Sequence, residues 1–204
     1  MKNKINIAVT GIGSLIGQAV IKSIQRSDLK DKINIIGFDY FNDTVGSFWI
    51  EERYILPDIL SPGVTHQEWL DFIVKLIIER DIKILFVGVD FELPIFAKHK
   101  EDIESKTGAI VMVSSIEVVE IADDKYLTYE FLKKNGLPHP QSHLPGEIDY
   151  DILDYPVIVK PRKGARSVGV YKVKNKNHLL TFCMAFKEQK AFANFEKYKF
   201  KTTP

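Results

Sequence analysis

The sequence predicts an α/β fold in two parts, a parallel sheet covered by helices and, after it, a smaller α+β lobe with antiparallel strands. Up to about residue 113, apolar strand patterns alternate with helical patterns, which is typical of a parallel sheet with right-handed crossovers. Beyond this point, two strand patterns follow one another with only a glycine-rich connection between them, which indicates an antiparallel hairpin. We therefore expect one domain at residues 1–114 and a second at 115–204.

The first domain repeats the order strand, helix, strand. Apolar runs predict strands at 5–10, 33–38, 54–56, 84–87 and 109–113. Helical spacing of apolar residues begins at Ile16 and recurs from Trp69 to Ile77, and a short helix is expected at 93–99. This order predicts a Rossmann-like arrangement of the sheet.

The second domain begins with two short helices, expected at 116–121 and 124–135. Gly136 follows them and is well suited to end a helix in the left-handed conformation. The remaining expected elements are strands at 157–160 and 168–173, a helix from about Asn177, and a helical, Lys-rich tail at 187–204. The two strands have no helical pattern between them and therefore form the predicted hairpin.

The composition favours a globular protein without a membrane span. The chain is 45% hydrophobic and 27% charged, and no apolar run reaches the roughly 18 residues that a spanning helix needs. The single Cys183 excludes an internal disulfide, and the N-terminus lacks a signal-peptide pattern, so we expect a cytoplasmic protein. A net charge of +1 conceals twelve Lys or Arg against two Glu in residues 155–204. This basic segment predicts contact with an anion such as a nucleotide, a nucleic acid or an acidic protein surface.

A first glycine turn, residues 11–17, connects a predicted strand to a predicted helix. Glycines at such a place let the backbone turn tightly and bring N–H groups close to an anion. The third glycine comes one residue later than in the dinucleotide pattern G-x-G-x-x-G, although Asp39 at the end of the next strand would suit a ribose hydroxyl. The alternative interpretation is that Gly11, Gly13 and Gly17 only allow the helix to pack against the strand.

A second interpretation of the chain is a short-chain dehydrogenase that uses NAD or NADP. Tyr129 and Lys133 form the Tyr-x-x-x-Lys pair of that chemistry, and Ser115 lies upstream at a plausible distance. However, Tyr and Lys four residues apart are common on helices, and residues 87–90, Val-Gly-Val-Asp, replace the motif that this family carries.

A second glycine cluster lies between the two strands of the predicted hairpin. Lys160 ends the first strand, and a connection with Gly164 and Gly169 follows it. Such a loop can fold over a polyphosphate and donate backbone N–H groups, while Lys160 and Arg166 neutralise charge. The cluster is not a Walker loop, because it lacks the Gly-Lys-Ser/Thr ending and no helix follows it directly.

Residues 156–170 read Pro-Val-Ile-Val-Lys-Pro-Arg-Lys-Gly-Ala-Arg-Ser-Val-Gly-Val, which resembles the signature of ATP-grasp ligases of the carbamoyl-phosphate synthase type. Residues 124–140 resemble the helix of that family and the entry into its small lobe. Residues 9–18, 37–39 and 90–94 are similar to its pre-ATP-grasp domain. The resemblance runs from about residue 5 to residue 180 in the order of the family, with residues 1–114 as the pre-ATP-grasp domain and 115–204 as the first lobe.

The resemblance implies a role for each matched residue. In this family ATP phosphorylates a carboxylate, and an amine then attacks the acyl phosphate. The residues implied to contact ATP are Lys125, Lys160, Gly164, Ala165, Arg166, Ser167, Val168 and Gly169. Those implied to bind the non-nucleotide substrate are Gly11, Gly13, Asp39 and Glu92. No catalytic residue and no metal ligand is assigned, and which carboxylate and amine react stays open.

The resemblance also implies that the chain lacks the second lobe, whose acidic residues hold Mg²⁺ in the family. After Asp154 the chain has no Asp and only Glu188 and Glu196, whereas magnesium usually takes one or two protein carboxylates. We therefore expect no complete ligase reaction from this chain alone. One partner to consider is a separate chain that supplies the second lobe. A non-catalytic remnant of the family is a further alternative, and a nucleic-acid partner is disfavoured because the aromatic residues of the basic segment fit a helix face equally well.

Overall fold

A computed structural model describes residues 4–144, 147, 149–164, 167–181 and 198–202. The chain divides into two compact units, residues 1–116 (unit 1) and residues 117–204 (unit 2). Within the described part of the chain, no helix combines the length and the apolarity that crossing a membrane requires.

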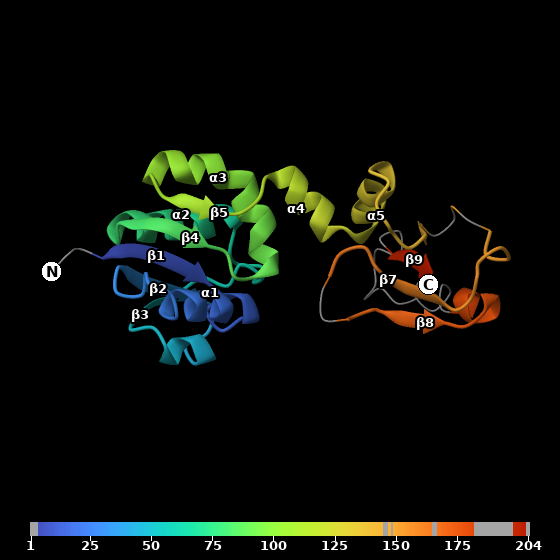
Figure 1. The fold of residues 1–204 in the computed structure, drawn as a ribbon, viewed down its shortest axis with the longest axis horizontal. Coiled ribbons are helices and arrows are strands. Elements are labelled where there is room, and N and C mark those ends of the chain that lie inside the picture. The colour runs from blue at the N-terminus through green and yellow to red at the C-terminus, as the bar shows by residue number, and fades with distance from the viewer. Residues whose placement is uncertain (1–3, 145–146, 148, 165–166, 182–197, 203–204) are drawn as a thin grey trace. The chain divides into compact units, whose positions relative to one another are not determined.

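Unit 1 is built on a five-stranded sheet in the order β3-β2-β1-β4-β5, in which every pairing is parallel (Figure 1). Its strands are β1 (Ile5–Thr10), β2 (Ile33–Asp39), β3 (Glu52–Ile55), β4 (Ile82–Phe86) and β5 (Ile110–Met112). All strands therefore end at the same edge of the sheet, which we call the carboxyl edge. The predicted Rossmann-like parallel sheet is confirmed.

Three helices and two short 3-10 helices connect the strands: α1 (Leu15–Gln25), η1 (Val45–Phe48), α2 (His66–Glu79), η2 (Asp90–Glu92) and α3 (Leu93–Thr107). The α2 helix begins with a capping box, in which Thr65 and Glu68 each accept the other's backbone N–H. The α3 helix continues to Gly108, whose φ of 70° ends it, so the short helix predicted at 93–99 was too short. The second half of α3 is polar and buries only Ile103. Because it has no apolar stripe, the sequence pattern did not predict it.

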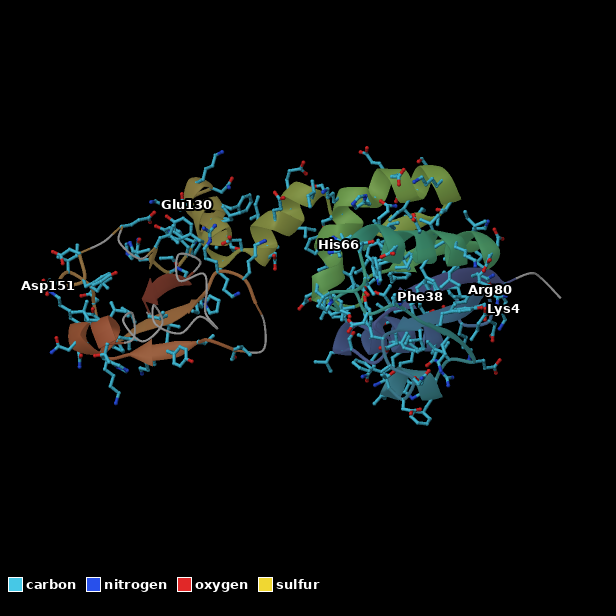
Figure 2. The ribbon with its side chains drawn as sticks, turned by 180° about the vertical axis from the view of Figure 1, so that it is seen from behind. Lys4, Phe38, His66, Arg80, Glu130 and Asp151 are labelled. Carbon is cyan, nitrogen blue, oxygen red and sulfur yellow. The ribbon has the colours of Figure 1, made fainter. Side chains whose placement is uncertain are left out.

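The core of unit 1 lies where α2 and α3 pack against the sheet. Trp69 of α2 and Phe96 of α3 are fully buried with ring centroids 5.1 Å apart. Phe38 of β2 is equally buried and lies in the interior of this unit (Figure 2). These large side chains remove much apolar surface from water, which fixes the sheet and hence the positions of the loops at its carboxyl edge.

The described part of unit 2 contains three helical segments and a four-stranded antiparallel sheet in the order β6-β9-β7-β8. The elements are α4 (Ile116–Asp123), which starts at the last residue of unit 1, α5 (Lys125–Lys134), β6 (Ser142–His143), β7 (Val157–Pro161), β8 (Tyr171–Val173) and β9 (Tyr198–Thr202). Residues 176–181 are helical. The predicted hairpin is confirmed, because β7 pairs antiparallel with β8 from Val157 opposite Val173.

Two expectations for unit 2 were wrong. The β8 strand starts at Tyr171 and not at Val168, because Ser167 and Gly169 have positive φ angles of 57° and 73° that interrupt extended backbone. Residues 198–202 form the strand β9 and not a helix. Their sequence alternates with a period of two, and β7 offers them a free edge to pair with, with Val159 opposite Phe200. The rest of the tail predicted to be helical, residues 187–197, lies outside the described residues.

Candidate functional site

The four residues expected to bind substrate in unit 1 lie at the carboxyl edge of the parallel sheet. Gly11 and Gly13 follow β1, Asp39 ends β2, and Glu92 lies in η2 after β4. Since β1 lies between β2 and β4, this is the place where the strand order reverses, and ligands of open α/β sheets commonly bind there.

Glu92 is a fully buried carboxyl group that two hydroxyls hold. The Tyr40 hydroxyl donates to Oε1 over 2.7 Å, and the Thr10 hydroxyl donates to Oε2. The Thr10 oxygen in turn accepts the Gly88 N–H over 2.9 Å, so one chain of hydrogen bonds joins the ends of β1 and β4. Burial raises the pKa of Glu92 to about 7, against the opposing effect of the hydrogen bonds from Thr10 and Tyr40. This carboxyl group therefore exchanges its proton near neutral pH.

Asp39 is 5% exposed and its side chain turns toward the first glycine turn. Its Oδ2 accepts the Gly13 N–H over 2.8 Å and the Thr44 hydroxyl over 3.2 Å. Its Oδ1 accepts the Tyr40 N–H over 2.7 Å. The side chain expected to meet a ribose or a substrate is thus held by hydrogen bonds within the chain.

The glycines of this edge allow parts of the backbone to approach one another closely. An added Cβ would lie 2.5 Å from Thr44 Cβ at Gly13, 2.2 Å from the Gly11 carbonyl oxygen at Gly17, and 2.1 Å from the Thr10 carbonyl oxygen at Gly88. None of these distances can accommodate a side chain. The packing interpretation of the first glycine turn therefore accounts for these positions.

The residues of the dehydrogenase interpretation are divided between the two units. Tyr129 and Lys133 lie on α5 in unit 2, whereas Ser115 and the first glycine turn lie in unit 1. Tyr129 is 6% exposed, its hydroxyl donates to the Gln141 side chain over 3.4 Å, and the Lys133 ammonium lies over its ring at 5.5 Å. This tyrosine is therefore packed inside unit 2, against side chains of its own unit.

A second cluster forms where α5 begins and β7 ends. The Lys125 ammonium donates to the carbonyl oxygens of Gly164, at 2.9 Å, and Arg162, at 3.3 Å. The backbone N–H of Lys125 also donates to the Arg162 carbonyl, over 3.0 Å. Lys125 is therefore anchored to the start of the connection between β7 and β8, residues 162–170, which we call the glycine loop.

Asp124 fixes the start of α5 against the same loop. It caps the helix by accepting the Tyr126 N–H over 2.8 Å, and it accepts both Nε of Arg162, at 3.1 Å, and Nη2, at 2.6 Å. Burial alone would raise the pKa of Asp124, but the Arg162 guanidinium and the helix N–H groups outweigh it and lower the pKa. A bidentate ion pair between Asp124 and Arg162 thus ties the start of α5 to the residue after β7.

The structure places the other predicted nucleotide residues as follows. Lys160 lies in β7, half-buried, and pairs through its backbone with Lys199 of β9. Ser167 is exposed, Val168 is 69% exposed, and Gly169 completes a turn with a φ of 73°. Ala165 and Arg166 lie outside the described residues. Within the predicted set, a hydrogen bond joins Lys125 to Gly164.

Three described aspartates of unit 2 are paired with basic side chains and not with one another. Asp124 pairs with Arg162, Asp123 with Lys163 over 3.0 Å, and Asp151 with Lys176 over 2.5 Å. Among the described residues of the whole chain, no group of three or more His, Cys, Asp or Glu is arranged to hold a metal ion. No step of the chemistry is therefore assigned to a metal held by these residues.

Sequence reasoning missed four residues that organise these clusters: Thr10, Tyr40, Asp124 and Arg162. Asp124 was detectable as an N-cap, since an Asp stands directly before a helical pattern. Tyr40 directly follows a strand-ending Asp, and Arg162 directly follows the Lys-Pro end of β7, but neither position indicates its partner. Those partners, Glu92 and Asp124, are 52 and 38 residues away in the sequence.

Comparison with known proteins gives these clusters a family context. Residues 122–189 match the family model of the ATP-grasp domain. Over 87 residues the chain is 30% identical to carbamoyl-phosphate synthase from Methanobrevibacter smithii, a match that covers 41% of this chain and 24% of that protein.

Solved structures share the fold over the whole chain. An L-amino acid ligase from Bacillus licheniformis is 17% identical with a TM-score of 0.64. The match covers 100% of this chain and 45% of that one. The biotin carboxylase domain of Hydrogenobacter thermophilus 2-oxoglutarate carboxylase, in complex with MgADP, ADP and bicarbonate, is 17% identical with a TM-score of 0.69 and the same coverage. The chain thus spans about a quarter of the curated relative and just under half of these structures. Residues 122–189 are thus similar to the ATP-grasp domain, and the chain as a whole shares the fold of these two solved structures.

Proposed function

We propose that unit 2 binds the phosphates of ATP and that the chain is the ATP-binding portion of an ATP-grasp carboxylate–amine ligase resembling carbamoyl-phosphate synthase. In this proposal, unit 1 is the pre-ATP-grasp domain and unit 2 the first ATP-grasp lobe. The observation that carries the proposal is the attachment of the Lys125 ammonium to the start of the glycine loop, at Gly164 and Arg162.

Charge and backbone geometry support a phosphate ligand at this loop. Lys125 has two carbonyl partners but no carboxylate within salt-bridge distance among the described residues, so its positive charge is available to an anion. Gly164 has a φ of 119° and open space around its Cβ position, so the loop can change conformation there. A loop of this kind can present N–H groups to phosphate oxygens while Lys125 and Lys160 offset their charge.

The reaction proposed for the complete ligase has two steps. A carboxylate oxygen attacks the γ-phosphorus of ATP, the bond to the β-phosphate oxygen breaks, and ADP leaves. An amine nitrogen then attacks the carbonyl carbon of the acyl phosphate, inorganic phosphate leaves, and the amine gives up a proton. The role proposed for Lys125, Lys160 and residues 164–169 of the glycine loop is to position the γ-phosphate and offset its charge.

Binding is the direct test, because it does not require turnover by this chain. Calorimetric titration of the purified protein with ATP, NAD and single-stranded DNA at two salt concentrations separates three kinds of ligand. We expect saturable ATP binding and no NAD binding. The variants Lys160→Ala and Lys125→Gln should each weaken ATP binding about tenfold or more, the effect of losing one charged hydrogen bond.

Lys134→Gln is the matched control, since Lys134 is an exposed lysine on the same helix as Lys125 but lies at its other end. It should leave ATP affinity within about twofold of the wild type, because an exposed charge a helix length away is largely screened. NAD binding without ATP binding would support the dehydrogenase interpretation instead. DNA binding that falls steeply with salt would support a nucleic-acid function.

A further inference from the structure

In unit 1, the first glycine turn holds an anion that belongs to the chain itself. The carboxylate of Asp39 accepts the Gly13 N–H at 2.8 Å, the Thr44 hydroxyl at 3.2 Å and the Tyr40 N–H at 2.7 Å. Backbone N–H groups of a glycine turn together with a hydroxyl are the partners that phosphate oxygens take in a phosphate site. Asp39 therefore stands where a phosphate would bind.

Three further backbone donors of the turn are also engaged. The Ile12 N–H donates to the Phe38 carbonyl over 3.3 Å, the Ser14 N–H to the Gly11 carbonyl over 2.8 Å, and the Gly17 N–H to the Ser14 hydroxyl over 2.9 Å. Space is closed as well, because a Cβ on Gly13 would already lie 2.5 Å from Thr44. A phosphate could reach the Gly13 N–H only by displacing Asp39.

The charge of the carboxyl edge also disfavours the binding of a phosphate. The segments that follow the five strands, residues 11–14, 40–44, 56–65, 87–92 and 113–115, contain Asp43, Asp58, Asp90 and Glu92 but no Lys, Arg or His. The opposite edge carries basic residues, among them Lys4 before β1 and Arg80 before β4 (Figure 2). An anionic ligand would therefore meet repulsion at the carboxyl edge of unit 1.

We propose that Asp39 is a specificity-determining residue that fills the anion position of the first glycine turn and bars phosphate-bearing ligands, dinucleotides included, from the carboxyl edge of unit 1. This role belongs to unit 1 and does not require ATP binding by unit 2. Its consequence rests on the proposed function: the part of the non-nucleotide substrate that reaches this edge is uncharged or cationic, such as the ammonium form of an amine.

Chemical rescue tests the proposal on the full chain. Asp39→Ala removes the internal anion and leaves the donors of Gly13, Tyr40 and Thr44 open to solvent. In a Lys160→Ala background, which weakens any phosphate binding by unit 2, formate or inorganic phosphate should raise the melting temperature of Asp39→Ala along a saturating curve, by roughly 4 °C or more. Asp43→Ala removes an exposed acid from the same edge and is the matched control; it should respond to these anions no more than to chloride at equal ionic strength.

Equal responses of Asp39→Ala to formate, phosphate and chloride would overturn the proposal. If this variant does not fold even in formate, the wild type supplies the measurement: phosphate and NAD are titrated while the Gly13 and Tyr40 amide resonances are followed by NMR. Both resonances should stay in place, and a saturable shift of either would overturn the proposal. A failure of ATP binding would appear separately, in the ATP titration of the wild type, which does not involve Asp39.

Discussion

The two glycine segments of this chain use glycine for opposite reasons. In the first glycine turn, the missing side chain lets backbone approach backbone, and added Cβ atoms would lie 2.5 Å or less from neighbouring atoms at Gly13 and Gly17. At Gly164 in the glycine loop, an added Cβ would meet nothing within 4 Å, but φ is 119°. The first segment is closed by packing, whereas the second needs glycine for its backbone conformation alone.

This difference shows that a glycine pattern does not by itself make a phosphate site. The N–H groups of the first turn are taken by the Asp39 carboxylate and by backbone acceptors, whereas the second segment begins beside a lysine ammonium. The partners of the donors decide whether a glycine segment can bind an anion, and those partners come from distant parts of the sequence. Four predictions test this comparison, from the largest expected effect to the smallest.

The first prediction compares Gly17→Ala with Gly164→Ala. Alanine has a helix propensity about 1 kcal/mol better than glycine. However, its Cβ at position 17 would lie 2.2 Å from the Gly11 carbonyl oxygen, and this clash makes the substitution destabilising. We expect a loss of about 3 kcal/mol in the free energy of unfolding of unit 1. The measurement is urea unfolding followed by tryptophan fluorescence, because Trp49 and Trp69 both lie in unit 1 and unit 2 has none.

Gly164→Ala should leave that transition unchanged and weaken ATP binding, because the strain of about 1–3 kcal/mol at a positive φ is confined to the loop. The comparison between the two segments fails if both variants lower the free energy of unfolding of unit 1 by the same amount.

The second prediction concerns pH and Glu92. Its pKa in the folded protein is about 7, above the ordinary value of 4.5, so the folded state binds more protons than the unfolded state between these values. The stabilisation is present below pH 4.5 and is lost as pH rises through about 7, which amounts to on the order of 3 kcal/mol. Tryptophan-monitored unfolding at pH 5 and pH 8 should show this loss in the wild type. Glu92→Gln cannot ionise and should lose much less; an equal loss in both proteins would contradict the assignment.

The third prediction concerns Arg162→Ala. The variant leaves Asp124, which is 4% exposed, without its guanidinium partner, and an unpaired buried carboxylate is costly. We expect a loss of about 2 kcal/mol in the stability of unit 2 and weaker ATP binding, because the start of α5 positions Lys125. Far-UV circular dichroism follows the unfolding of both units, whereas tryptophan fluorescence follows unit 1. The loss in unit 2 is therefore measured from the circular dichroism transition that has no counterpart in fluorescence. Unchanged ATP affinity would separate the ion pair from the proposed site.

The smallest effect is predicted for Lys163→Ala, one residue further along the same loop. The Lys163 side chain is 57% exposed and pairs with Asp123, which is 39% exposed, so solvent screens the interaction. The change should be less than about 0.5 kcal/mol in the same circular dichroism measurement. A loss as large as that of Arg162→Ala would show that general charge, and not the buried geometry of the Asp124 pair, stabilises this loop.

The sequence predicted most elements of the fold because periodicity is a local property. Buried strands contain apolar runs, such as Ile7-Ala8-Val9 in β1, and helix ends carry local signals such as Gly136. The prediction failed where local signals were weak, in the polar half of α3 and in β9. The strand β9 depends on pairing with β7, a partner about 40 residues earlier in the chain.

What the sequence determined by itself is the order of elements, the parallel and antiparallel parts, and the position of two glycine segments beside lysines and acids. The tertiary structure alone decided which donors those glycines leave open. Asp39 reaches Gly13 across 26 residues, Tyr40 reaches Glu92 across 52, and Lys125 reaches Gly164 across 39. Spacing along the chain carries no information about such contacts, because they form only when separate strands and helices pack into one unit and exclude water from the groups between them.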